Sequence, residues 1–233
     1  MNKPKDWTSF DVVKKVRNKL GIKKVGHVGS IDPFATGLLI LLIDKATKLS
    51  DKMMGLDKEY ITVSKFGVHT DTGDITGKII KEEEMPEISR ERFESMIPAI
   101  LDIKKQIPSK YSAIKINGKK AYTLARSGKK FDMPEREIKI KEFELLEYNF
   151  PFFKWRSVVS KGTYIRTLTE QIAELFDGIA VSVELERTRV GEFSVKDSIG
   201  IDEVCEERII IPQNDGLGCF TGSQRQFEKA KSV

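Results

Sequence analysis

The feature that most constrains this chain is a twelve-residue loop, residues 26–37, which leads directly into the apolar run 38–43. The loop contains three glycines, a proline and a single acidic residue, Asp32. Glycine permits sharp turns and close approach to a ligand, and Pro33 biases Asp32 towards an extended conformation. The apolar run predicts a buried strand that anchors the loop. A carboxylate on a shaped loop beside a rigid core element is typical of an active site.

The composition is that of an ordinary globular protein. The chain has 233 residues, of which 39% are hydrophobic and 32% charged, so it can bury a core and lies outside the disordered class. It has no apolar stretch long enough to cross a membrane and no signal peptide, so we expect a cytoplasmic protein without membrane contacts. Its two cysteines form no CxxC pair and its two histidines lack ligand-spaced neighbours, so we expect no metal.

Positive charge is concentrated in one segment, residues 104–130. This basic segment holds nine lysines and arginines and no acidic residue, whereas the whole chain carries only +5. A basic patch on a slightly acidic body indicates a nucleic-acid binder, although a solvated lysine-rich face is the simpler alternative. Tyr111 and Tyr122 lie within the segment and can stack on bases, which favours the first interpretation.

Hydrophobic periodicity and turn signals predict a mixture of helices and strands without a regular βαβ alternation. We therefore expect an α/β or α+β domain with a mixed, largely antiparallel sheet flanked by helices, and an arm formed by the basic segment. The expected helices cover residues 9–20, 46–54, 89–97, 121–125 and 168–176, and the expected strands cover 38–43, 60–66, 138–148, 155–159 and 181–185.

Five motifs in the chain resemble those of the TruB-type tRNA pseudouridine synthases, in the same order. Residues 26–37 are similar to that family's catalytic loop, and residues 57–60 to its D-K-x-Y motif. Residues 160–168, 185–191 and 106–128 resemble its S-x-G-T-Y-I-R-[ST]-L, L-R-R-T-x-x-G and arm motifs. The resemblance extends from Lys3 to about Pro212, and it implies a pseudouridine synthase fold.

The resemblance implies that the protein isomerises uridine 55 in the T-loop of tRNA to pseudouridine, with tRNA as partner and no cofactor. Asp32 would be the catalytic carboxylate and Tyr60 would stack on the target uracil. Arg166 would pair with Asp32, which an extended chain at 160–168 would allow. His27 would enter the T-loop and help to expel the base. The remaining substrate-binding residues would be Tyr164, Leu185, Lys115, Lys119 and Arg126.

Simpler interpretations of these residues remain open. Asp32 could only organise its loop, His27 could only support it, and β propensity alone explains Tyr60. Asp71-Thr72-Gly73 matches the D-T-G of aspartic proteases but is explained as a turn. The serious alternative is an RNA-binding or tRNA-folding protein with little or no catalysis. A pure binder would not need Asp32, Tyr60 and Arg166 together, so we expect an enzyme.

Three departures from the family pattern affect the expected organisation. The strand before the family's D-K-P motif is missing or shortened, because the chain begins Met1-Asn2-Lys3-Pro4. Glu186 replaces a basic residue, which weakens a local phosphate contact. We expect residues 1–212 to form one catalytic domain with an insertion at about 104–133. Residues 213–233 would form a tail too short for the family's C-terminal PUA domain. We also expect a monomer.

Overall fold

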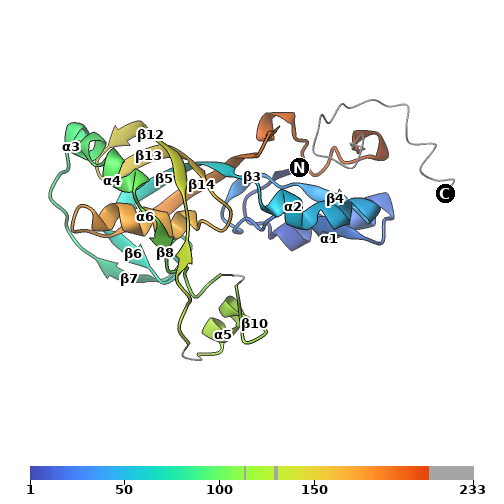
Figure 1. Cartoon of the computed structure of the whole chain (residues 1–233), viewed down its shortest axis with the longest axis horizontal. Coiled ribbons are helices and arrows are strands. Elements are labelled where there is room, and N and C mark those ends of the chain that lie inside the picture. Colours follow the sequence, from blue (N-terminus) through green and yellow to red (C-terminus); the bar gives the residue numbers. More distant parts are fainter. Residues whose placement is uncertain (113, 129–130, 210–233) are drawn as a thin grey trace.

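The computed structural model describes residues 1–112, 114–128 and 131–209, and Figure 1 shows a central sheet with a lobe at one side and an arm below. Among those residues the main sheet has seven strands in the order β1-β3-β14-β5-β13-β12, with β15 paired to β14. Only β14 and β3 pair in parallel, so the predicted mixed, largely antiparallel sheet is confirmed. The strands are β1 (Asn2–Lys3), β3 (Thr36–Leu38), β5 (Lys58–Phe66), β12 (Ile140–Asn149), β13 (Phe152–Val159), β14 (Ala180–Val190) and β15 (Phe193–Ser194).

The N-terminal lobe consists of residues 1–56 without the main-sheet strands β1 and β3, and its first element is the predicted first helix, α1 (Ser9–Leu20). Thr8 and Asp11 form a reciprocal capping box, and Gly21 ends the helix in the left-handed conformation that glycine adopts without strain. The lobe continues with β2 (Val25–His27), β4 (Leu41–Ile43), the 3₁₀ helix η1 (Asp44–Leu49) and α2 (Ser50–Met54). The helix expected at 46–54 is therefore a 3₁₀ turn followed by a short α-helix.

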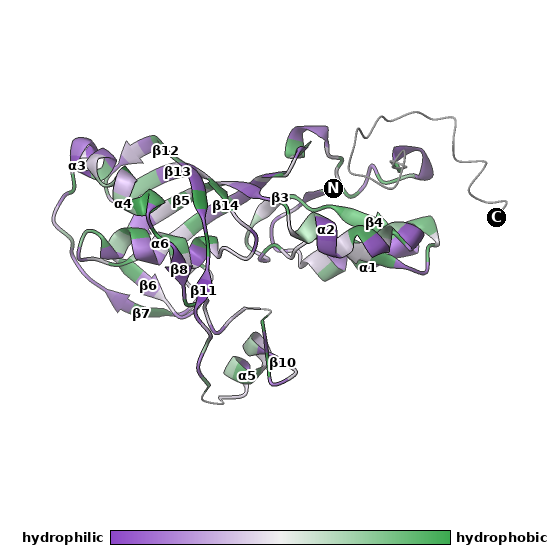
Figure 2. Cartoon of the chain, viewed as in Figure 1, coloured by the Kyte–Doolittle hydropathy of each residue, from purple (hydrophilic) through white to green (hydrophobic). Residues whose placement is uncertain are grey.

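The prediction of one strand at 38–43 is wrong. Residues up to Leu38 pair with β1 and β14 in the main sheet, whereas Leu41–Ile43 pair with β2 in the lobe. The chain thus changes sheet around Ile40, whose carbonyl accepts a hydrogen bond from Val28 N (2.9 Å). Both halves are apolar, as the colouring of β4 in Figure 2 shows, and an apolar run does not encode which sheet its residues join.

The chain forms a two-residue strand close to its N-terminus. β1 pairs antiparallel with β3 through Asn2 and Lys3. The Lys3 side chain is completely buried, and its Nζ donates to the carbonyls of Trp7 (2.8 Å) and Pro33 (3.2 Å). This buried ammonium ties the strand to the loop that carries Asp32.

A buried polar network fixes helix α6 (Ile165–Glu174) on the sheet. Trp155 Nε1 donates to Ser64 Oγ at 3.0 Å, and Ser64 Oγ lies 3.2 Å from Thr169 Oγ1. Thr169 Oγ1 in turn lies 2.9 Å from Ser182 Oγ, so the network joins α6 to three strands. Because buried polar groups lose free energy when unpaired, this network favours one register of α6 over its alternatives.

The chain at 160–168, whose pairing with Asp32 was considered for an extended conformation, is instead helical from Ile165 onwards, where α6 starts. Ile165, Leu168 and Ile172 follow the helical repeat and are all buried in the core. The preceding residues are held by Gln106, whose side chain accepts from Tyr164 N (2.9 Å) and donates to Tyr164 O (3.2 Å).

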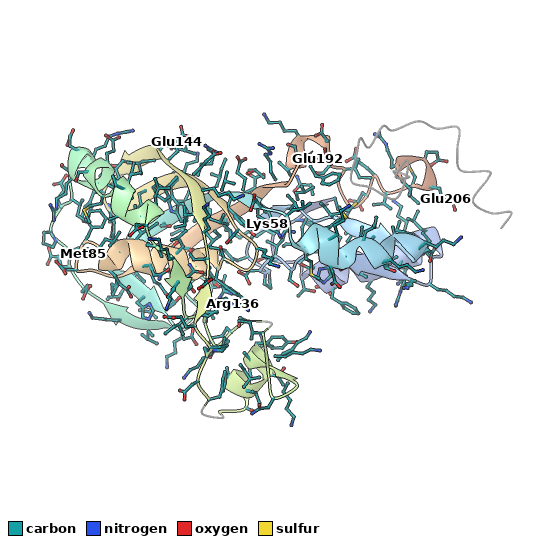
Figure 3. All side chains as sticks on the ribbon, viewed as in Figure 1. Lys58, Met85, Arg136, Glu144, Glu192 and Glu206 are labelled. Atoms are coloured by element: carbon teal, nitrogen blue, oxygen red, sulfur yellow. The ribbon has the colours of Figure 1, made fainter. Side chains whose placement is uncertain are left out.

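The arm, residues 107–135, projects from the body as expected (Figure 1). It is closed at its base by pairing of β8 (Lys105–Gln106) with β11 (Arg136–Glu137), and Figure 3 labels Arg136 at this base. The arm contains a hairpin of β9 (Lys115–Ile116) and β10 (Lys119–Lys120), followed by α5 (Ala121–Arg126). Lys129 and Lys130 of the basic segment lie outside the described residues, as does the tail predicted at 213–233.

Two further pairs of elements belong to the body. β6 (Val68–Thr70) pairs with β7 (Ile79–Glu82). Helix α3 (Arg90–Ser95) is capped by Ser89, as predicted, and leads into α4 (Ile97–Leu101).

The core between these helices and the sheet is rich in aromatic rings. Phe93 is fully buried, and its ring centroid lies 5.2 Å from that of Phe153 and 5.4 Å from that of Phe176. No helix in the described ranges is long and apolar enough to span a membrane.

The substitution Phe93→Ala is expected to lower the free energy of unfolding by about 3–5 kcal/mol, because it leaves a cavity inside the aromatic cluster. The control Phe10→Ala removes a ring that is 63% exposed and is expected to change stability by less than about 0.5 kcal/mol. Urea denaturation of both variants measures the difference. Equal losses would contradict the assignment of the core.

Candidate active site

Asp32 is presented on a loop that its neighbours hold in place. Ile31 N donates to Ser9 Oγ at 3.0 Å, and Ser9 Oγ lies 3.3 Å from Ile31 O, so α1 is bound to the residue before Asp32. On the other side, Phe34 and Ala35 are buried in the core. The Asp32 side chain keeps 35% of its surface exposed. The loop therefore offers a positioned carboxylate to solvent or to a ligand.

Arg166 holds this carboxylate through two hydrogen bonds. Arg166 Nε donates to Asp32 Oδ2 at 2.9 Å, and a terminal guanidinium nitrogen, NH2, donates to Asp32 Oδ1 at 3.0 Å. The Arg166 side chain is only 5% exposed. Such a bidentate, charge-assisted pair fixes the orientation of the carboxylate. The predicted pairing of Arg166 with Asp32 is confirmed, although Arg166 reaches Asp32 from the first turn of a helix.

A second carboxylate, Asp74, supports Arg166 from behind and was missed by the sequence analysis. Asp74 Oδ2 lies 3.4 Å from the Arg166 guanidinium, whose NH1 also donates to Thr72 O. Asp74 is buried, and its Oδ1 accepts from Thr76 N at 3.0 Å. The turn signal at 70–74 was recognised, but the contact of its last residue with α6 depends on tertiary packing.

Gly73 allows that turn to approach α6. Its φ is +75°, and a Cβ at this position would lie 3.0 Å from Glu170 Oε1 and 3.3 Å from Arg166 Cβ. The turn is also joined to β14, since Ser182 N donates to Gly73 O at 3.1 Å. Any larger residue here would push the turn away from Arg166.

Tyr60 and Leu185 lie on the same face of the main sheet. Tyr60 on β5 is paired with Arg187 on β14, and Thr62 is paired with Leu185. Paired residues of adjacent strands share a face, and residues two apart along a strand also share it. Tyr60 is half-buried and Leu185 is buried, so this face offers a partly covered aromatic ring beside an aliphatic side chain.

Arg187 holds the 26–37 loop through two of its flanking carbonyls, and the sequence analysis did not name it as a site residue. Its Nε donates to Leu38 O at 2.8 Å, and its NH2 donates to Gly29 O at 3.1 Å. The side chain is 1% exposed. Gly37 lies so close that a Cβ there would come within 2.4 Å of Arg187 O. The motif at 185–191 marked this residue, but which carbonyls it reaches is decided by strand register.

His27 is neutral at the start of the loop. Burial lowers its pKa, and the nearby cations Arg187 and Lys120 lower it further. Its Nδ1 is buried and has no hydrogen-bond partner among the described residues. A neutral imidazole fits a contact with a base better than an ion pair.

The remaining predicted residues divide into two groups. Tyr164 is half-buried directly before α6, and burial raises the pKa of its hydroxyl. Lys115, Lys119 and Arg126 are exposed on the arm, and none of the hydrogen bonds or ion pairs among the described residues joins them to Asp32. On the arm, Lys120 and Arg126 lie 5.5 and 5.7 Å from the ring centroid of Tyr122.

Figure 3 labels Lys58 where β5 leaves the lobe. Its Nζ donates to Met54 O and Leu56 O, both at 2.6 Å, and burial lowers its pKa to about 8. Lys3 is buried in the same way, with a pKa of about 8.

Within the described ranges no cluster of three or more His, Cys, Asp or Glu side chains is placed to hold a metal ion.

Glu170, on the turn of α6 after Arg166, is a titrating group behind the site. Burial raises its pKa to about 7 against the opposing effect of Arg166, and its Oε1 lies 3.4 Å from His69 Nδ1. A raised carboxyl pKa means that the folded state keeps its proton where the unfolded state has lost it. Glu170 therefore leaves stability unaffected below about pH 4.5 and reduces it as the pH rises to about 7.

The substitution Glu170→Gln should remove this pH dependence. When the pH is raised from 5 to 8, the free energy of unfolding of the variant is expected to rise by about 1–3 kcal/mol relative to that of the wild type, because only the wild type pays for ionising a buried carboxyl group. Urea denaturation at the two pH values measures the gain. The control Glu174→Gln removes an exposed carboxyl one turn further along α6. A gain of the same size in the control, or none in Glu170→Gln, would refute the role of burial.

The substitution Arg187→Met should increase local opening of the 26–37 loop more than opening of the rest of the chain. It leaves the buried carbonyl of Leu38 without its donor, at a cost of about 1–3 kcal/mol, and removes the donor of the partly buried Gly29 carbonyl at a smaller cost. Hydrogen exchange should accelerate at the amides of residues 28–38 more than elsewhere. Arg189→Met, at an exposed arginine two residues along β14, is the control and should leave that exchange unchanged. Uniform acceleration would show a loss of global stability instead.

Residues 17–165 match the TruB family pseudouridylate synthase (N terminal domain). Among curated proteins, the chain is 42% identical over 221 residues to tRNA pseudouridine synthase B of Clostridium tetani, covering 94% of this chain and 76% of that protein. It is 39% identical over 218 residues to the protein of the same name from Parabacteroides distasonis, covering 90% of this chain and 93% of that one.

Solved structures show the same fold. A chain from a crystal structure of a Cbf5-Nop10-Gar1 complex superposes with a TM-score of 0.60 at 26% identity, covering 83% of this chain. A chain from an H/ACA RNP bound to a substrate RNA gives a TM-score of 0.58 at 24% identity. This chain spans about half the length of each of these, 48% and 49%.

Proposed function

The chain belongs to the TruB family of pseudouridylate synthases, and we propose that it isomerises uridine 55 in the T-loop of tRNA to pseudouridine with Asp32 as its catalytic carboxylate. The observation that carries the assignment of Asp32 is its geometry. It is a partly exposed carboxylate held in a bidentate pair by an almost fully buried Arg166. This arrangement orients the carboxylate while leaving one side of it open to a ligand.

The reaction breaks the N1–C1′ glycosidic bond of uridine, turns the uracil over and joins its C5 to C1′. The C5 proton is released to solvent, and the N1 position receives a proton in exchange, so the overall change is an isomerisation without net oxidation. No cofactor is needed for this balance. Asp32 supplies the nucleophile or base that the reaction requires, and Arg166 keeps its carboxylate aligned through the step.

The target base has to leave its stack before it can meet Asp32. Extrusion costs a few kcal/mol, which contacts in the pocket have to offset. Tyr60 offers a half-buried ring on which the uracil stacks, and Leu185 on the same sheet face provides an apolar wall. His27 is a neutral wedge at the start of the loop. Tyr164 lines the site next to Arg166.

The arm binds the RNA backbone. Lys115, Lys119 and Arg126 are exposed cations on a projection anchored to α6 through Gln106 and Tyr164. Phosphate contacts of this kind position an RNA without reading its sequence. Asp32, Tyr60 and Arg166 all come from one chain, so the proposed site needs no residue from a second copy, and we propose that the protein acts as a monomer. Its tRNA substrate is consistent with action in the cytoplasm.

A second candidate is RNA binding or tRNA folding without catalysis. The basic arm would serve either role. The paired Asp32 and Arg166 favour the enzyme, because a buried guanidinium aligned on a partly exposed carboxylate has no evident use in binding a polyanion.

Tritium release from an unmodified tRNA transcript labelled at uracil C5 tests the function directly. The wild type is expected to release tritium, and Asp32→Asn to release none while still binding tRNA. The control Asp51→Asn changes an exposed acid on α2 and should retain release. Binding without release by the wild type would support the second candidate, and release by Asp32→Asn would refute the role of that residue.

A further inference from the structure

A second basic segment, not used above, lies in the N-terminal lobe. Between residues 12 and 31 there is no acidic residue. The same stretch holds six cations, which form what we call the α1 ridge: Lys14, Lys15, Arg17, Lys19, Lys23 and Lys24. Residues 1–56 carry eleven basic and five acidic residues, a net charge of +6. With +9 in residues 104–130, the rest of the chain is left with a net charge of −10.

All six side chains of the ridge are exposed, whereas Val12, Val13 and Val16 bury the opposite face of α1. Figure 2 shows the resulting hydrophilic bands along the helix. None of the ion pairs found among the described residues involves a ridge cation. The ridge is therefore an accessible cluster of positive charge that has not been neutralised by the protein's own carboxylates.

Helix electrostatics explain only part of the ridge. Arg17 and Lys19 lie in the last turn of α1, where cations stabilise the helix dipole, and Lys19 Nζ also donates to Asp202 O. Lys14 and Lys15 precede that turn, and Lys23 and Lys24 follow the helix end at Gly21. These four cations have no such structural use.

The ridge is held at a defined distance from Asp32. Ser9, at the start of α1, is hydrogen-bonded to Ile31, and the helix then runs away from the loop for twelve residues, or about 18 Å. β2 returns the chain to His27. Lys23 and Lys24 thus lie at the far end of the lobe, beyond the reach of a single extruded nucleotide at Asp32.

The surface at that far end is hollowed. Arg17, Asn18 and Lys23 line an open depression together with Gly21 and Ile22. Two cations and an amide donor around a shallow hollow match the needs of a phosphate group, which accepts hydrogen bonds from all three. The arm, with α5 and β10, lies below the body in Figure 1, whereas α1 lies to one side of the body.

We propose that the α1 ridge is an RNA-binding surface that holds the phosphate backbone of the tRNA outside the target loop. The proposal rests on the proposed function, since it assigns a further contact to the same RNA. The arm and the ridge bind that RNA at two separate places, with the catalytic loop between them. Two widely spaced electrostatic contacts orient an RNA better than one, because each fixes a different part of its backbone.

The test removes three ridge charges that have no role in the helix dipole: Lys14→Gln, Lys15→Gln and Lys23→Gln in one variant. The matched control removes three exposed charges remote from the ridge: Lys81→Gln on β7, with Arg90→Gln and Arg92→Gln on α3. Both variants lose the same net charge. Fluorescence anisotropy with labelled, unmodified tRNA gives Kd at several salt concentrations, and thermal melting confirms that both variants are folded.

The ridge variant is expected to bind tRNA at least about tenfold more weakly at 0.1 M salt, with a salt slope reduced by about 2–3. The control should bind within about twofold of the wild type. Wild-type affinity and slope in the ridge variant, or equal weakening in the control, would overturn the proposal. Should the triple variant melt early, Lys23→Gln alone, which lies outside α1, is expected to reduce the slope by about 1.

Two further measurements locate the contact and separate it from catalysis. If the isolated T-arm hairpin shows the same weakening as tRNA, the ridge binds the T-stem, and if only tRNA shows it, the ridge binds the tRNA body. Tritium release by the wild type is measured in parallel. A wild type that binds tRNA but releases no tritium refutes the proposed function, while the comparison of Kd values still decides the ridge.

Discussion

The pair between Asp32 and Arg166 is the interaction on which the site depends. It joins residues 134 positions apart, one on a loop of the N-terminal lobe and the other on a helix packed on the sheet. Two parallel hydrogen bonds tolerate little displacement, so both partners have to be positioned independently. Ser9 and Arg187 position the loop, and the hydroxyl network of Ser64, Thr169 and Ser182 positions the helix.

The lobe is joined to the sheet by buried cations that use main-chain carbonyls as partners. Lys3, Lys58 and Arg187 are all nearly or fully buried, and their hydrogen bonds go to carbonyl oxygens around the loop and at the end of α2. A carbonyl partner satisfies the hydrogen bonds of a cation but does not cancel its charge. Burial lowers the pKa of His27, and the charge of Arg187 lowers it further, while uncancelled positive charge beside the loop suits a polyanionic substrate.

Charge at the surface is also distributed unevenly between the parts of the molecule. The arm and the α1 ridge carry the positive charge, and the remaining body is acidic. The net negative charge of the rest of the chain disfavours RNA there, so the charge distribution itself favours an approach of tRNA along those two surfaces.

Local sequence determined the chemistry of this protein and most of its elements. The turn residues of the loop at 26–37, the cap and end of α1 and most strands of the main sheet followed from residue types and their spacing, because turns, caps and amphipathic periods are encoded over a few residues. The pairing of Arg166 with Asp32 was implied by the resemblance to the TruB-type synthases, and the structure contains it. Tertiary structure alone decided that the apolar run 38–43 divides between two sheets and that Arg166 lies on a helix. It also decided that Asp74 and Arg187 support the site. These features depend on strand register and on contacts between residues more than 90 positions apart, which no local pattern specifies.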